Sequence, residues 1–376
     1  MHCVTREAIV SITGTIEITT EGTIRLGMGI DSATIMEFFR KRLTSQKNEM
    51  LSKGIEELRF FYREANWINH EIPYELLADT KDLLSSGWLN LKWEHEPFEL
   101  PIELIGHRDE MVQEFQKRGK LRTGPGGLPD NQNCPRVIGF DKQRKELMLQ
   151  QAVYYDQVAT NLCMDFRLQT QAYNFGNTIR EIDRNYFVVG RHLQKKEPVN
   201  EGLTPFEKSF LANTLGVACM IVFKNGEVFY RLRSEKTAVY GKQAHVPVSF
   251  AQEVRPNSKS PRTLEDLVMQ DLHLEFYQET GLEYNGYISK AIPLGFCRDI
   301  LRGGKPQLFL LLESKKNVEQ FTRDLQDKSA DLRVQEYKKK PVILNSEKSI
   351  DNMSTELAGG LYLLWKARTF GAKNKD

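Results

Sequence analysis

A predicted β-hairpin in the second half of the chain is the feature that most restricts its fold. An apolar run at residues 216–223 is followed by the turn sequence Lys-Asn-Gly-Glu at 224–227 and by a second strand-like run at 228–233. Asn-Gly readily adopts the positive backbone angles that a tight hairpin turn requires. The first strand is continuously apolar, so we expect it to be buried.

A helix is predicted downstream of the hairpin. Pro261 suits a first helical turn, and Thr263 with Asp266 has the pattern of a capping box. Gly281 stands in the left-handed position that commonly ends a helix. We therefore predict a helix from Thr263 to Thr280.

Two strands and a closing helix complete the second half of the prediction. The strands are expected at 288–296 and 307–312, around the sequence Arg-Gly-Gly-Lys-Pro at 302–306, and the helix is expected at 354–368. Helices and strands occur together along the chain, so the expected fold class is α/β.

The first half of the chain is divided from the second by a run of turn formers. Residues 119–139 contain Thr-Gly-Pro-Gly-Gly-Leu-Pro-Asp-Asn, which we interpret as a linker or long loop. We predict an N-terminal α/β domain of unknown role at 1–146 and a second domain at 147–376. Helices are expected at 31–63, 79–85 and 144–157.

Composition restricts the class of protein. The 376 residues are 40% hydrophobic and 27% charged, as in a globular protein, and no apolar stretch is long enough to span a membrane. The 52 basic and 50 acidic residues give a net charge of +2, so neither duplex DNA nor a membrane is an expected partner. The five scattered cysteines form no CxxC pair, and we expect a reducing, cytoplasmic location.

Three carboxylates recur every fourth residue on the predicted helix. Asp271, Glu275 and Glu279 would form one stripe, with neighbouring side chains about 5–6 Å apart. Oxygen ligands at this spacing suit a hard cation such as Mg²⁺, which shares its other sites with water and substrate phosphates. A solvated helix face gives the same pattern, so the spacing alone leaves both interpretations open.

The segment 274–282, Leu-Glu-Phe-Tyr-Gln-Glu-Thr-Gly-Leu, resembles the second half of the Nudix box, the signature of the Nudix hydrolase family. In that family the box reads Gly, five residues, Glu, seven residues, then Arg-Glu-aliphatic-x-Glu-Glu-x-Gly-aliphatic. The residues that agree are Glu275, Phe276, Glu279, Gly281 and Leu282, with Asp266 where the first Glu belongs. The resemblance implies a Nudix-like α/β/α sandwich, a mixed β-sheet flanked by helices, with its core at about 205–345.

The box is degenerate at three positions. Ser260 replaces the opening Gly, and Leu274 replaces the Arg that orients a carboxylate in the family. Gln278 replaces one of the paired glutamates that bind metal, and its amide offers only a neutral oxygen. We expect weaker metal binding than in a complete box. Asp266 also suits a helix cap, which we favour over a ligand role.

The resemblance implies a Mg²⁺- or Mn²⁺-dependent hydrolase of a nucleoside diphosphate linked to another moiety. Glu279 would be the main metal ligand, Glu275 a second ligand or the base for water, and Gln278 an auxiliary ligand. The alternative is a catalytically weak or inactive Nudix-like module that binds a nucleotide as a sensor or regulator. A nucleotide-derived small molecule is the expected partner in both cases, and a homodimer is left open.

Four cationic residues are candidates for phosphate contacts. Arg298, Arg302 and Lys305 flank Gly303-Gly304, where backbone amides and side-chain charges would cradle an anion. Arg231 on the returning hairpin strand would face the same cleft. An ordinary Gly-Gly turn and exposed strand arginines would give the same sequence.

Overall fold

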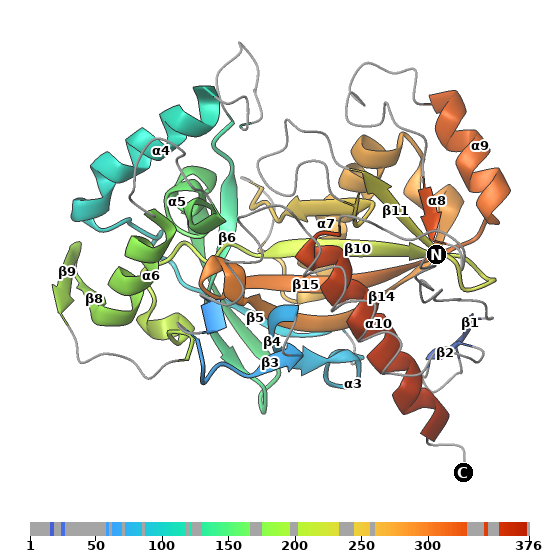
Figure 1. Cartoon of the computed structure of the whole chain (residues 1–376), viewed down its shortest axis with the longest axis horizontal. Helices are drawn as coiled ribbons and strands as arrows, with labels where there is room; N and C mark the ends of the chain where they lie inside the picture. The colour runs from blue at the N-terminus through green and yellow to red at the C-terminus, as the bar shows by residue number, and fades with distance from the viewer. Residues whose placement is uncertain are drawn as a thin grey trace, which may run out of the picture.

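The chain is an α/β protein whose helices pack against mixed sheets (Figure 1). The computed structural model describes residues 16–18, 24–26, 58–59, 62–69, 72–84, 87–117, 121, 130–165, 175–195, 202–232, 244–255, 260–328, 342–344 and 353–373. None of the helices in these ranges combines the length and apolar character that crossing a membrane demands.

The central element is a sheet to which the described residues contribute nine strands. These are β3 (Trp67–Asn69), β4 (Ile72–Asp79), β10 (Gly216–Val222), β11 (Val228–Leu232), β12 (Ala244–His245), β13 (Val248–Ala251), β14 (Ile288–Asp299), β15 (Lys305–Ser314) and β16 (Val342–Leu344). The order is β12-β11-β10-β15-β14-β4-β3, with β13 paired to β10 and β16 to β11. Strands β10 and β15 pair in parallel. Strand β10 pairs antiparallel with β11 and β13, and β14 pairs antiparallel with β15 and β4.

Three smaller sheets accompany the central one in the described parts of the chain. The largest has the order β5-β7-β6, with strands β5 (Asn90–Trp93), β7 (Glu146–Val153) and β6 (Asn133–Asp141). The other two are the antiparallel pairs β1 (Ile16–Ile18) with β2 (Ile24–Leu26), and β8 (Tyr186–Val189) with β9 (His192–Lys195).

Helices cover both faces of the central sheet (Figure 1). On one face, Phe276 of α7 (Leu264–Thr280) shares a core with Leu310 of β15. On the other, Leu357 of α10 (Thr355–Lys373) shares a core with Phe309. Successive strand residues point to opposite faces, so a strand segment buried between two helical layers is expected to be continuously apolar, as β10 and residues 308–312 of β15 are.

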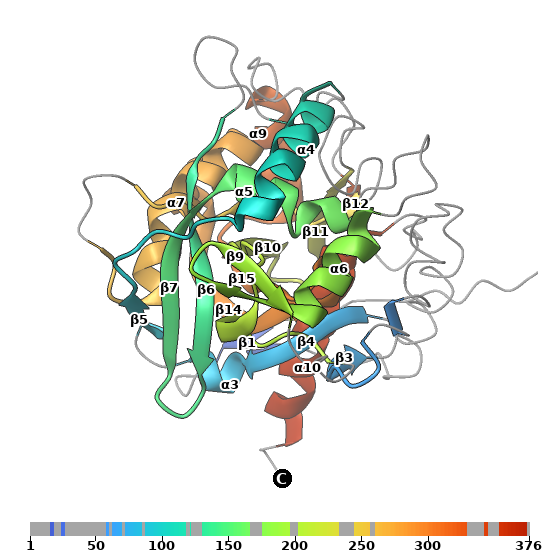
Figure 2. The same cartoon turned by 90° about the vertical axis from the view of Figure 1, so that its left-hand side faces the viewer.

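The remaining helices are short or lie away from the sheet centre. They are α3 (Thr80–Leu83), α4 (Ile105–Lys117), α5 (Tyr154–Ala159), α6 (Phe175–Asn185), α8 (Tyr284–Tyr287) and α9 (Val318–Lys328). Helices α4, α5 and α6 lie side by side at one end of the molecule (Figures 1 and 2), where they enclose a separate apolar core. We call α4, α5 and α6 the helical unit.

The predicted hairpin and capped helix are confirmed. Strands β10 and β11 pair antiparallel, and Gly226 in their turn has a φ of 86°. The Thr263 hydroxyl accepts a hydrogen bond from the Asp266 amide at 3.1 Å, and Gly281 ends α7 with a φ of 69°. The strands at 288–299 and 305–314 and the closing helix are slightly longer than expected.

The helix expected at 144–157 is wrong over most of its length. Residues 146–153 form β7, and the helix α5 does not begin until Tyr154. Leu147 and Leu149 are buried while their neighbours are half-buried, which is the period of a strand. The apolar spacing fits both periods over so short a run, and pairing with β5 and β6 decides in favour of the strand.

The sheets take strands from both sides of the expected boundary at residue 146. Strand β4 pairs with β14, and β5 pairs with β7. Residues 133–139 of the expected loop belong to β6, whose edge position in its sheet tolerates Pro135. The helix expected at 31–63 lies largely outside the described residues.

Packing of the two helices on the sheet predicts a large difference between two Leu→Ala substitutions. Leu310 is fully buried, whereas Leu274 is 47% exposed. We expect Leu310→Ala to lower the free energy of unfolding by about 2–5 kcal/mol, and Leu274→Ala to change it by less than about 0.5 kcal/mol. Urea unfolding followed by circular dichroism measures both, and equal losses would contradict the placement of α7.

Candidate functional site

The acidic stripe of α7 faces the interior. Asp271, Glu275 and Glu279 are 3%, 5% and 7% exposed, as their common helix face predicts. Carboxylates that are this deeply buried require compensation by cations or hydrogen-bond donors. The candidate site is therefore defined by what surrounds each carboxylate.

Asp271 is held by the segment that follows β13. Its carboxylate accepts hydrogen bonds from the Arg255 guanidinium at 2.7 and 3.0 Å, from the Glu253 amide at 2.9 Å and from the Gln252 side chain. These contacts fasten α7 to the end of β13. Asp271 is thus engaged as a structural anchor.

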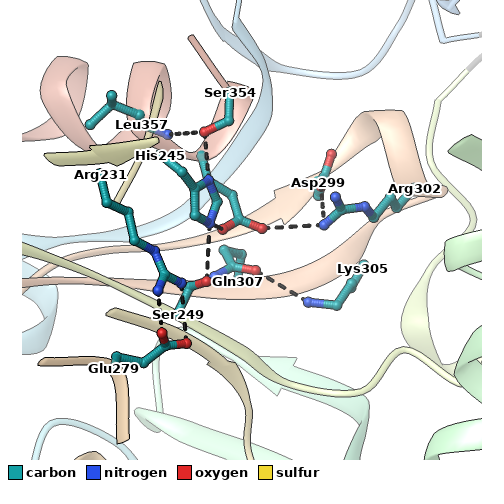
Figure 3. Close-up of polar contacts among 11 residues, drawn as sticks. Arg231, His245, Ser249, Glu279, Asp299, Arg302, Lys305, Gln307, Ser354 and Leu357 are labelled. Carbon is teal, nitrogen blue, oxygen red and sulfur yellow. Dashed lines mark hydrogen bonds and ion pairs between the residues drawn. The ribbon is translucent and has the colours of Figure 1, made fainter. Parts of the chain in front are cut away.

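Glu279 forms a buried ion pair with Arg231 of β11 (Figure 3). Both guanidinium Nη atoms donate to the carboxylate, with Nη2 lying 3.1 Å from Oε1 and Nη1 forming the other bond. Arg231 is 4% exposed. The structure therefore brings together the predicted main metal ligand and a predicted phosphate contact, but it pairs them with each other.

Glu275 and Gln278 lie on different sides of α7. Glu275 faces β10. Burial raises the pKa of the Cys219 thiol on that strand, and the charge of Glu275 raises it further. Gln278 is exposed, away from the acidic stripe. It is therefore not positioned beside Glu275 and Glu279 as the predicted auxiliary ligand would be.

The residues as arranged do not fit a divalent metal site. Two of the three carboxylates in the stripe are engaged by arginines, and Gln278 points elsewhere. Within the described ranges, no group of three or more His, Cys, Asp or Glu residues is placed to hold a metal ion. A hard cation needs several oxygen ligands that are not already neutralised.

A second set of buried polar residues lies next to this ion pair (Figure 3). His245 of β12 stands opposite Arg231 in the sheet. We call the whole set the polar network, and its residues are Arg231, His245, Ser249, Glu279, Asp299, Arg302, Lys305, Gln307, Ser354 and Glu356. It joins strands β11 to β15 with the N-terminus of α10.

Glu356 connects Arg302 and His245 in the polar network. Its Oε1 lies 3.3 Å from Arg302 Nη1, and its Oε2 lies 3.1 Å from His245 Nε2. Arg302 Nη1 is also 3.5 Å from Asp299 Oδ2. These side chains are buried, so the charge of Arg302 requires compensation. The Asp299 and Glu356 carboxylates provide it.

His245 is fully buried and lies between two serines. Its Nδ1 is 2.7 Å from the Ser354 hydroxyl, and its Nε2 is 3.0 Å from the Ser249 hydroxyl. The Ser354 hydroxyl also accepts a hydrogen bond from the Leu357 amide at 3.1 Å, which caps α10. The histidine thereby links the start of α10 to β13.

Arg298 is engaged by the protein around it. It donates to the Thr204 carbonyl at 2.6 Å, stacks over the Phe206 ring at 4.4 Å and pairs with Glu75 at 3.7 Å. Burial lowers its pKa, and Glu75 opposes that effect. The side chain fastens β14 to the segment before β10. Protein groups therefore already bind the guanidinium that was predicted to contact a phosphate.

Several residues of the polar network were not predicted from the sequence. Asp299 and Gln307 lie next to the predicted cations, but His245, Ser354 and Glu356 come from distant segments. They belong to no local motif, and only the pairing of β12 with β11 and the docking of α10 bring them together. Sequence spacing carries no signal for such a cluster.

Comparisons with known proteins give little beyond this geometry. No family model and no curated protein matches the chain. Among solved structures, the crystal structure of DR0079 from Deinococcus radiodurans matches with 16% identity and a TM-score of 0.22. The match spans 28% of this chain and 59% of the DR0079 chain, and a likeness this small carries no argument about fold or function.

The Arg231–Glu279 pair predicts strong energetic coupling. Arg231→Met leaves the Glu279 carboxylate buried without its cation, so we expect a loss of about 3–5 kcal/mol in the free energy of unfolding. The double variant Arg231→Met/Glu279→Met buries no unpaired charge and should lose much less than the sum of the single losses.

The matched control is Arg144→Met, since Arg144 is 78% exposed and pairs only at the surface with Asp141. We expect it to change stability by less than about 0.5 kcal/mol. Denaturant unfolding is measured for Arg231→Met, Glu279→Met, the double variant and Arg144→Met. The first three give the coupling energy. Additive losses for Arg231 and Glu279 would contradict the ion pair.

Proposed function

We propose that residues 147–376 form a Nudix-like domain, with its core at about 205–345, that binds a nucleotide-derived small molecule as a sensor or regulatory module. The hairpin β10–β11, helix α7 and strands β14 and β15 follow one another in the order that the family resemblance implies. Helices α7 and α10 cover opposite faces of the sheet, which supports an α/β/α sandwich (Figure 1).

The observation that carries this proposal is the ion pair between Arg231 and Glu279. An arginine on the carboxylate neutralises the charge that a metal ion would otherwise neutralise. Binding of an anionic ligand to nearby cations requires no metal at the stripe, whereas hydrolysis of a diphosphate of this kind does.

Metal-dependent hydrolysis is the second candidate, and the placement of Glu275 favours it. Glu275 and Glu279 lie one turn apart on the buried face of α7, as the catalytic hypothesis requires. For Mg²⁺ or Mn²⁺ to bind both carboxylates, Arg231 would have to leave Glu279. This requirement separates the two candidates in experiment.

A regulatory role is supported by contacts between the helical unit and the turn that carries Arg302. The Asn161 side chain, just beyond α5, donates to the Arg302 carbonyl at 2.9 Å. Arg180 of α6 donates to the Leu301 carbonyl at 2.6 Å. A ligand that shifts this turn would therefore act directly on the helical unit.

The cellular setting is part of the same proposal. Cys134, Cys163, Cys219 and Cys297 are free and buried, which supports a reducing, cytoplasmic location. We also propose that two copies associate, which size-exclusion chromatography with light scattering would test.

The proposal predicts saturable nucleotide binding that does not depend on metal. The test is calorimetry with nucleoside diphosphates and nucleoside diphosphate sugars, in Mg²⁺, in Mn²⁺ and in EDTA. We expect dissociation constants that agree within about threefold, a difference below ~0.7 kcal/mol, and no product by chromatography.

Two variants make the test sharper. Gln278→Glu restores the carboxylate that the Nudix box lacks, and we expect no turnover because the side chain is exposed. Glu279→Gln removes the charge of the predicted main metal ligand, so any metal-dependent turnover should be lost in this variant. Metal-dependent turnover that Gln278→Glu increases and Glu279→Gln abolishes would establish the hydrolase instead.

A further inference from the structure

The candidate phosphate contacts differ in how far the protein already uses them. Arg231 is bound by Glu279, and Arg302 lies between Asp299 and Glu356. Arg298 donates to backbone carbonyls and stacks on an aromatic ring. Arginines held in this way have to break existing bonds before they can bind a ligand.

Lys305 is held much more loosely. Its ammonium carries three donors, and among the described residues it makes one hydrogen bond, to Gln307 Oε1 at 3.2 Å. That partner is a neutral amide, and the lysine is only 4% exposed. A buried ammonium with a single neutral partner is unfavourable unless an anion or water completes its shell.

The chain positions this ammonium through glycines. Gly303 and Gly304 have φ values of 64° and 90°, so they form a turn that directs β15 to begin at Lys305. Gly216, at the start of β10, lies against the lysine: a Cβ there would collide with Lys305 Nζ and with Gln307 Oε1. A side chain at 216 would thus displace the ammonium from its place beside Gln307.

We propose that Lys305, together with the Gln307 amide, binds a phosphate group of the nucleotide that the proposed function assigns to this domain. This inference rests on that proposed function and names the contact within it. The Lys305 ammonium donates to the phosphate oxygens, and the Gln307 Nε2 group adds a second donor on the same strand. Arg231, Arg298 and Arg302 keep their protein partners.

Burial and the neighbouring charges together set the protonation of Lys305. Burial, and then the charge of Arg302, lower the pKa of Lys305 to about 8. The Glu356 and Asp299 carboxylates, and Cys134 of β6, oppose that effect without cancelling it. A phosphate next to the ammonium would raise this pKa again, so binding at pH 8.5 should be accompanied by proton uptake.

The experiment compares nucleotides with their nucleosides. Isothermal titration calorimetry at pH 8.5 uses ADP, GDP, UDP and CDP, each beside its nucleoside, with the full chain and with Lys305→Met. We expect Lys305→Met to weaken binding of the preferred diphosphate about tenfold or more and to leave the affinity for its nucleoside unchanged.

The matched control is Lys290→Met, because Lys290 lies on β14 with its side chain exposed. We expect it to bind both ligands as the wild type does. Titrations of the wild type in two buffers of different ionisation enthalpy measure proton uptake without any substitution. Circular dichroism establishes that each variant is folded.

The outcomes separate this inference from the proposed function. If no nucleotide binds the wild type, the proposed function and the Lys305 contact are both wrong. If the wild type binds a diphosphate and Lys305→Met binds it equally tightly, the domain still binds nucleotides but Lys305 is not the phosphate contact. Equal weakening for nucleotide and nucleoside would also overturn it, since a structural loss affects both ligands.

Discussion

Compensation of buried charge is the constraint on which the site depends. Three buried cationic residues and three buried carboxylates lie on the central sheet, on its β14–β15 turn or on the helices packed against it. They are Arg231, Arg302 and Lys305, and Glu279, Asp299 and Glu356. Removing such groups from water is costly, so each arginine is placed against a carboxylate. These pairings fasten β11 to α7, and the end of β14 to the start of α10, because a shift of either partner would leave a charge unpaired.

The elements with local signals could be predicted from the sequence. Asn225-Gly226 placed the hairpin, and Thr263 with Gly281 placed both ends of α7, because each depends on the backbone preferences of a few adjacent residues. Strand β7 could not be predicted in this way. Its short apolar run fits helical spacing as well, and only pairing with β5 and β6, which lie elsewhere in the chain, decides between them.

The same limit applies to the site. Four-residue spacing correctly placed Asp271, Glu275 and Glu279 on one face, but it could not show that this face packs inward against arginines from β11 and from the segment after β13. The roles assigned to Glu279 and Arg231 stay predictions until binding and turnover are measured. Their direct contact depends on the distance between α7 and β11, which is a property of the folded sheet.

Under the Nudix-like domain that we propose, the pairing gives a physical reason for the departures of α7 from the Nudix box. In the motif that α7 resembles, an Arg orients a carboxylate, but here Leu274 takes its place and is 47% exposed. Arg231, from β11, supplies a guanidinium to Glu279 from the opposite side. A helix that receives its cation from the sheet no longer needs one of its own, and a carboxylate at 278 would add charge only to the solvent face. Leu274 and Gln278 on the solvent face and the ion pair on the buried face therefore form one consistent arrangement, in which α7 is fastened to the sheet by charge.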